Sequence, residues 1–89
     1  MRAVITVIGK DMVGILARVS AVCAAHRVNV SDVTQSILQG MFAMIMMVDI
    51  SDCDVPFTAF SEELNVLGKE MGLSVHAMHE DIFNSMHRI

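Results

Sequence analysis

The sequence predicts an α+β domain with a ferredoxin-like βαββαβ order, in which a four-stranded antiparallel sheet carries two helices on one face. Two observations lead to this prediction: β-branched runs alternate with stretches of helical periodicity, and turn-forming residues separate them. The chain has 89 residues, enough for one domain, and no linker or repeat divides it. A domain of this size has modest stability, so we expect oligomerisation to reinforce it.

The first four elements are expected in close succession. A strand from Arg2 to Ile8 precedes a helix from about Met12 to His26, whose apolar residues recur at three- and four-residue spacing. Strands from about Val28 to Gln39 and from Met41 to Ile50 then flank Gly40, which predicts a tight hairpin. The second of these two strands is far more apolar than the first.

The remaining elements follow Pro56, which suits the start of a helix that Asp52 or Asp54 can cap. The apolar positions of this second helix again follow helical spacing: Phe57, Phe60, Leu64, Leu67 and Met71. Residues 73–79 return as the last strand. Residues 80–89 are expected to form a short amphipathic tail helix, with apolar side chains at Ile82, Met86 and Ile89.

Both faces of the strand at residues 41–50 are apolar, which predicts a partner surface. Side chains alternate along a strand, so one set is expected to pack under the two helices: Phe42, Met44, Met46, Val48 and Ile50. The opposite set consists of Met41, Ala43, Ile45 and Met47. Together with Val4 and Ile8 of the first strand, these side chains would otherwise meet water. We expect a second copy of the chain to cover this face. The alternative is that the tail helix folds over it.

Composition argues against several classes of partner. The formal net charge is −4, and the six Lys and Arg residues are scattered singly, so no basic patch is available for nucleic acid. The longest apolar stretch, Met41 to Val48, is far shorter than the roughly 20 residues that cross a membrane. We therefore expect a cytoplasmic protein without a nucleic-acid or membrane partner.

Catalysis and cofactor chemistry also lack support in the sequence. No Ser is placed with a His and an acid, so we predict no enzymatic activity and no catalytic residues. Cys23 and His26 would supply only half of a closed metal site, and His76 and His79 are expected on opposite faces of a strand. We predict no metal and no cofactor, and we expect Cys23 and Cys53 to be plain thiols.

The segment from Gly9 to Gly14 is the candidate ligand site. A β-branched run breaks at Gly9 and resumes as a helix around Gly14, and backbone N–H groups at a helix start attract a carboxylate or a phosphate. A phosphate loop is set aside, because Ile15 and Leu16 stand where that motif needs Lys and Ser or Thr. Alternatively, the two glycines serve only a tight turn and close packing.

Two motifs give the chain a resemblance to a known family. Gly9-Lys10-Asp11-Met12-Val13-Gly14-Ile15-Leu16 after the first strand, and His26-Arg27-Val28-Asn29-Val30 before the second, resemble an ACT domain, the small amino-acid-sensing module. The match covers residues 1–79 and leaves 80–89 as a helical tail. The closing segment from His79 to Ile89 sharpens it toward free-standing, functionally uncharacterised bacterial and archaeal ACT proteins. Residues 1–79 are also similar to the ACT repeats of the glycine cleavage system transcriptional repressor.

The resemblance implies a sheet-mediated homodimer that binds a small amino acid at the interface of its two chains, near the first strand-to-helix loop. In a serine-sensing member of the family, one ligand contact is an asparagine shortly before the second glycine of this loop, and another is the asparagine opening the second strand. Asp11 and Asn29 fall at these positions here. The resulting candidate ligand-binding residues are Gly9, Lys10, Asp11, Met12, Val13, Gly14, Ile15 and Asn29.

Asp11 departs from the family pattern, because a carboxylate accepts from a ligand ammonium group but repels a ligand carboxylate; Lys10 can offset that repulsion. Asn29 can equally be a turn residue. The strand that it opens is polar, which fits either a solvated edge or a polar cavity between two chains. The function predicted is that of a regulatory, amino-acid-binding homodimer. The alternative is a ligand-independent adaptor whose apolar sheet face or tail helix docks a partner enzyme or regulator.

Overall fold

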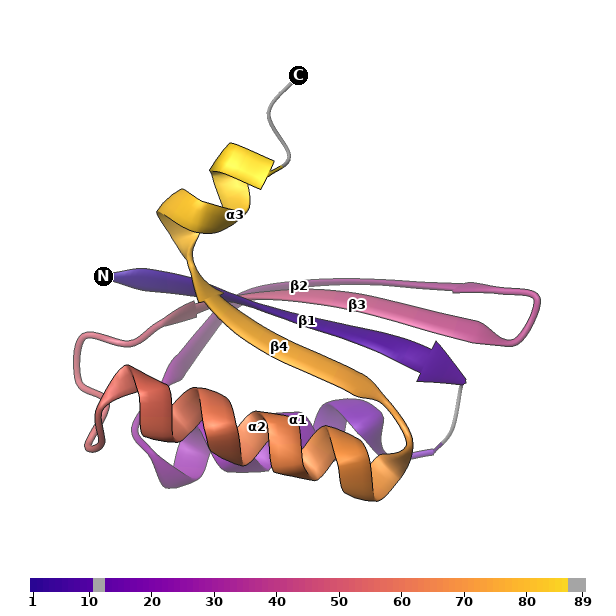
Figure 1. The fold of residues 1–89 in the computed structure, drawn as a ribbon, viewed down its shortest axis with the longest axis horizontal. Coiled ribbons are helices and arrows are strands. Elements are labelled where there is room, and N and C mark those ends of the chain that lie inside the picture. The colour runs from indigo at the N-terminus through magenta and orange to yellow at the C-terminus, as the bar shows by residue number, and fades with distance from the viewer. Residues whose placement is uncertain (11–12, 87–89) are drawn as a thin grey trace.

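The computed structural model describes residues 1–10 and 13–86, and it has the expected ferredoxin-like fold (Figure 1). The elements in chain order are β1 (Arg2–Lys10), α1 (Ile15–Ala25), β2 (Asn29–Leu38), β3 (Met41–Asp49), α2 (Phe57–Met71), β4 (Ser74–His79) and α3 (Glu80–Met86). The strands lie in the order β2-β3-β1-β4, and every neighbouring pair is antiparallel. β2 and β4 are therefore the edge strands of the sheet.

The helices divide between the two faces of the sheet (Figure 1). α1 and α2 cover one face, with α1 in contact with β2 and α2 in contact with β4. We call this the inner face. α3 lies on the opposite, outer face, where it contacts β1 and β4.

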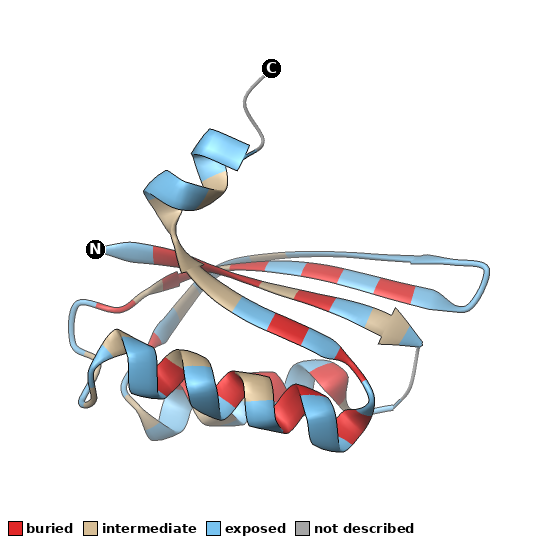
Figure 2. Cartoon of the chain, viewed as in Figure 1, coloured by how far each residue is buried: buried red, intermediate tan, exposed pale blue. Residues whose placement is uncertain are grey.

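The core lies between the inner face and the two long helices (Figure 2). Exposure alternates along β3 as predicted, with buried side chains from Phe42 to Val48 pointing inward. The largest side chain that is fully buried is Phe60 of α2, and the core stripe of α1 consists of Ile15, Val19 and Cys23. Packing of this kind makes the inner face the main source of stability.

Two local expectations are wrong. α1 begins at Ile15 rather than near Met12, because Gly14 adopts a left-handed backbone with φ 89° that interrupts the helical path. Met12 itself lies outside the described residues. The expected aspartate cap of α2 is also absent from the described residues, because Pro56 occupies the cap position. Asp54 instead binds the ring of His26.

The predicted hairpin is confirmed. Gln39 and Gly40 both have positive φ values, 53° and 80°, and they join Leu38 directly to Met41. Two successive residues of this kind are typical of the type I′ turn, whose twist matches that of the flanking strands.

A charged cluster at the end of α1 ties three elements together. His26 follows α1, its Nδ1 lies 2.8 Å from Asp54 Oδ1, and its Nε2 contacts Glu63 of α2. The ring also meets Phe60 edge-on, with centroids 6.1 Å apart. The hydrogen bonds with Asp54 and Glu63 raise the pKa of His26 above its ordinary value. The cluster joins α1 to α2 at the side of the core.

Candidate functional site

The glycine loop, residues 9–14, connects the end of β1 to the start of α1. Lys10 and Val13 are exposed, whereas Ile15 is buried in the core. Lys10 and Val13 therefore lie on the surface, and the first residue of α1 anchors the C-terminal end of the loop. The predicted contacts Asp11 and Met12 lie outside the described residues.

Glycine is needed at the two ends of the loop for different structural reasons. A Cβ on Gly9 would collide with the Leu73 side chain and lie 3.3 Å from its Cα, so Gly9 allows β1 to pack against the turn before β4. Gly14 has open space around it but needs its positive φ. The close-packing role considered for glycine is thus supported at Gly9, and the turn role at Gly14.

The start of α1 has the electrostatic character of an anion site. Its first turn contains no acidic residue, and among the described residues no side chain caps it. The carbonyl of Gly14 accepts the first hydrogen bond of the helix, from the Arg18 N–H at 3.0 Å. The preceding N–H groups have no acceptor within the helix, and they lie at the positive end of its dipole.

Asn29 lies at the other end of the sheet. It opens β2 and pairs with Asp49 in β3, whereas Gly9 pairs with Phe42. At the rise of a β-strand, the seven steps from Phe42 to Asp49 correspond to about 23 Å. Within one chain, the structure brings Gly9, Lys10, Val13, Gly14 and Ile15 together, and it does not bring Asn29 to them.

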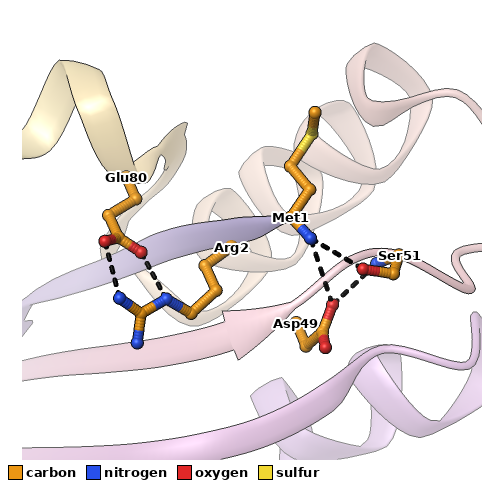
Figure 3. Close-up of polar contacts among 5 residues, drawn as sticks. All are labelled: Met1, Arg2, Asp49, Ser51 and Glu80. Atoms are coloured by element: carbon orange, nitrogen blue, oxygen red, sulfur yellow. Dashed lines mark hydrogen bonds and ion pairs between the residues drawn. The ribbon is translucent and has the colours of Figure 1, made fainter.

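A polar cluster lies instead at the end of the sheet that carries Asn29 (Figure 3). Arg2 binds Glu80 through two contacts, from Nη2 to Oε1 at 2.7 Å and from Nε to Oε2 at 2.5 Å. The Met1 amine donates to Ser51 Oγ at 2.7 Å, and the Ser51 N–H donates to Asp49 Oδ1 at 2.9 Å. The hydrogen bonds from Ser51 hold the pKa of Asp49 below its usual value.

Sequence reasoning missed this cluster. Arg2 and Glu80 are far apart in the chain, and only the antiparallel pairing of β1 with β4 brings them level. A cavity of about 590 Å³ adjoins them, lined by Met1, Arg2, His79, Glu80, Asp81 and Ile82. The lining carries two positive groups, the Met1 amine and Arg2, and two carboxylates, Glu80 and Asp81, so this cavity offers little net charge to a ligand.

The surroundings of the candidate metal ligands and of Cys23 are consistent with structural roles. His79 stacks on Phe57 on the inner side with centroids 4.4 Å apart, while His76, an odd number of residues away, is exposed. Across residues 1–10 and 13–86, no three His, Cys, Asp or Glu side chains are grouped so that they could hold a metal ion. Burial raises the pKa of the Cys23 thiol to about 11. Cys23 is therefore a poor nucleophile near neutral pH.

Within residues 1–10 and 13–86, none of the helices is both long and apolar enough to cross a bilayer.

The class of the domain is given by its ferredoxin-like fold, with a glycine on each side of the connection between β1 and α1. A family model described as "ACT domain" matches residues 2–78. The chain belongs to the ACT domain family, as the sequence resemblance predicted. ACT domains typically bind small-molecule ligands in regulation.

Relatives extend the match over the tail. The chain is 47% identical over 88 residues to a UPF0237 protein of Methanopyrus kandleri, covering 99% of this chain and 98% of that protein. It is also 47% identical over 89 residues to a UPF0237 protein of Clostridium acetobutylicum, covering 100% of both. Both alignments extend over the segment that forms α3.

Solved structures confirm the fold. An ACT domain protein from Streptococcus pneumoniae is similar with a TM-score of 0.80 and 35% identity, covering 93% of each chain. A putative glycine cleavage system transcriptional repressor superposes with a TM-score of 0.72 at 23% identity, covering 86% of this chain and 44% of the other. The second likeness concerns the fold alone.

Proposed function

We propose that this protein is a regulatory homodimer that binds a small amino acid between its two chains and performs no chemical step. One observation carries the proposal: the glycine loop and Asn29 lie at opposite ends of one sheet. A ligand that needs both can find them together only where two chains meet with their sheets running in opposite directions.

The edge strand β2 supplies a surface on which two chains can meet in this way. It is the outermost strand on its side of the sheet, and an edge strand presents backbone groups that can pair with another chain. Antiparallel pairing of two β2 strands would set Asn29 of one chain near Leu38 of the other. The hairpin end of the partner's sheet is also the end at which its β1 stops and its glycine loop begins.

The position of α1 supports the same arrangement. α1 contacts β2, so the glycine loop leads from β1 toward the side of the sheet where β2 lies. Ile37 and Leu38 are both exposed at the end of β2, where pairing of the two chains would bury them. Burial of apolar surface favours association. A sheet-mediated dimer would thereby complete the site and remove exposed apolar side chains.

The chemistry of the pieces suits an amino acid. Among the described residues no side chain caps the start of α1, which favours a carboxylate there, and Asp11, on the sequence argument, accepts from an ammonium group. The amide of Asn29 can donate and accept. Because the site would be shared by two chains, ligand binding would stabilise the dimer by mass action.

Thermal-shift measurements with each of the twenty amino acids test the proposal. We expect at least one to raise the melting temperature, and Asn29→Ala to remove that rise while Asn84→Ala on α3 retains it. A flat response to all twenty amino acids, from a protein shown to be folded, would overturn the proposal.

A second candidate function is a ligand-independent adaptor that docks a partner enzyme or regulator. The observation that favours it is the exposure of Ile82 and Met86 on α3. An adaptor would retain a partner from cell extract without added amino acid. Asp11→Ala and Asn29→Ala would then leave that partner binding intact, whereas they would disrupt the amino-acid response in the first proposal.

A further inference from the structure

A groove of about 350 Å³ lies on the outer face of the sheet, beside α3. Its volume falls at the lower end of the range of small-molecule sites, about 300–1,000 Å³. The apolar residues that line it come from three strands and α3: Ile8, Ala43, Met44, Ile45, Met78, Phe83 and Met86. The groove is separate from the glycine loop and from the cavity beside Arg2.

The strand register arranges the floor of this groove. Thr6 of β1 pairs with Ile45 of β3 on one side and with His76 of β4 on the other. These three residues form a row across the sheet, and all three line the groove. The hydroxyl of Thr6 and the imidazole of His76 therefore lie on neighbouring strands at the same level.

α3 gives the groove its second wall. Its first residue, Glu80, is fixed to Arg2 by two charge-assisted contacts, and the helix contacts both β1 and β4. Val4 on the outer face is 0% exposed, whereas Ile8, two side chains further along the same face, is 52% exposed. The helix thus covers one end of the outer face, and the groove lies where this cover ends.

The lining selects the chemistry of a ligand. Among the described residues that line the groove, His76 is the one ionisable side chain, and its charged form is positive. Thr6 adds a hydroxyl donor, and the described lining contains no carboxylate. A ligand with an apolar body and one carboxylate would match this lining, because a carboxylate accepts from both donors.

We propose that the groove between α3 and the outer face binds a small apolar carboxylic acid, with its carboxylate on Thr6 and His76 and its hydrocarbon part against Ile8, Ile45 and Phe83. At about 30 Å³ for each water-sized group, the volume holds a ligand of roughly twelve heavy atoms. This site is additional to the proposed amino-acid site. It lies over β1, β3 and β4, so pairing of two β2 edges would leave it open.

Titration calorimetry with decanoate, a ten-carbon acid, tests the proposal on the full-length protein, with decanol as the uncharged comparison. Ala43→Phe places a bulky side chain on the floor of the groove, and we expect it to weaken decanoate binding by about tenfold or more. Ala59→Phe is the matched control, because Ala59 is exposed on α2 and lies on the other side of the sheet. We expect it to leave binding unchanged.

His76→Ala provides a second variant that does not depend on how the strand tolerates a phenylalanine. We expect it to reduce the affinity for decanoate to that for decanol, while decanol binding changes little. Absence of decanoate binding, or an equal loss in Ala43→Phe and Ala59→Phe, would overturn the proposal. If Ala43→Phe changes only the sedimentation of the protein and not its decanoate binding, a second copy of the chain is the occupant of the groove, and this outcome also overturns the proposal.

Discussion

The two faces of the sheet differ in what they contribute. The inner face is closed by α1 and α2, and the residues of β1 and β3 that point to it from Ala3 to Val7 and from Phe42 to Val48 are buried (Figure 2). The outer face is covered at one end by α3 and remains exposed at Ile8, Met41 and Ile45. Stability is therefore concentrated on one face, while the outer face and the β2 edge are left for binding.

The largest expected effect compares two isoleucines on β1. Ile5 points to the inner face and is 0% exposed, and Ile8 points to the outer face and is 52% exposed. Ile5→Ala should lower the free energy of unfolding by about 2–5 kcal/mol, because it leaves a cavity in the core. Ile8→Ala should cost under about 1 kcal/mol. Urea unfolding measures both, and equal losses would contradict the division between the faces.

Gly14 provides the next largest effect. Gly14→Ala forces a side chain onto a left-handed backbone, so we expect it to lower the free energy of unfolding by about 1–2 kcal/mol. Asn tolerates this conformation better, and Gly14→Asn is the control with a smaller loss. Both are measured without ligand, which separates the conformational role of Gly14 from binding. Equal stability of all three proteins would contradict the role given to this backbone conformation.

The His26 cluster should make stability depend on pH. The pKa of His26 is raised in the folded protein, mainly by its hydrogen bonds with Asp54 and Glu63, from an ordinary value of 6.5. A raised folded pKa means that the stabilisation is fully present below pH 6.5 and is lost as the pH rises through the folded pKa. The difference in unfolding free energy between wild type and His26→Gln should therefore shrink on raising the pH. A difference that grows with pH would contradict the assignment.

The smallest effect is expected for the pair that fixes α3. Both side chains of the Arg2–Glu80 pair are partly exposed, and such pairs contribute about 0.2–1 kcal/mol. A double-mutant cycle with Arg2→Ala and Glu80→Ala should give a coupling energy toward the upper end of that range, because the contact has two points. Zero coupling would show that α3 is held by its apolar contacts alone.

Sequence patterns could predict the fold because they are local. Three local patterns each specify one element: alternation along residues 41–50, helical spacing around Phe60, and the Gln39–Gly40 turn. Patterns of this kind together predict the order of the elements along the chain. The Arg2–Glu80 pair and the α3 groove could not be predicted in this way. They depend on which strands become neighbours and on where a short helix comes to rest.

The predicted site residues fall into two groups for the same reason. Gly9 to Ile15 are consecutive in sequence and stay together, whereas Asn29 was assigned by resemblance and lies at the far end of the sheet. Its role as a ligand contact remains a prediction that requires a second chain. The expected bare outer face also proved smaller, because Val4 is already fully buried within one chain.

A mixed-dimer measurement tests the shared site most directly. Asp11→Ala and Asn29→Ala should each abolish the response to the amino acid that most stabilises the wild type. If each site combines the loop of one chain with Asn29 of the other, co-refolding the two variants in equal amounts should restore about a quarter of the wild-type binding sites, because mixed two-fold dimers contain one intact site. Calorimetric stoichiometry measures this recovery. No recovery in a mixture shown to contain mixed dimers would contradict the account.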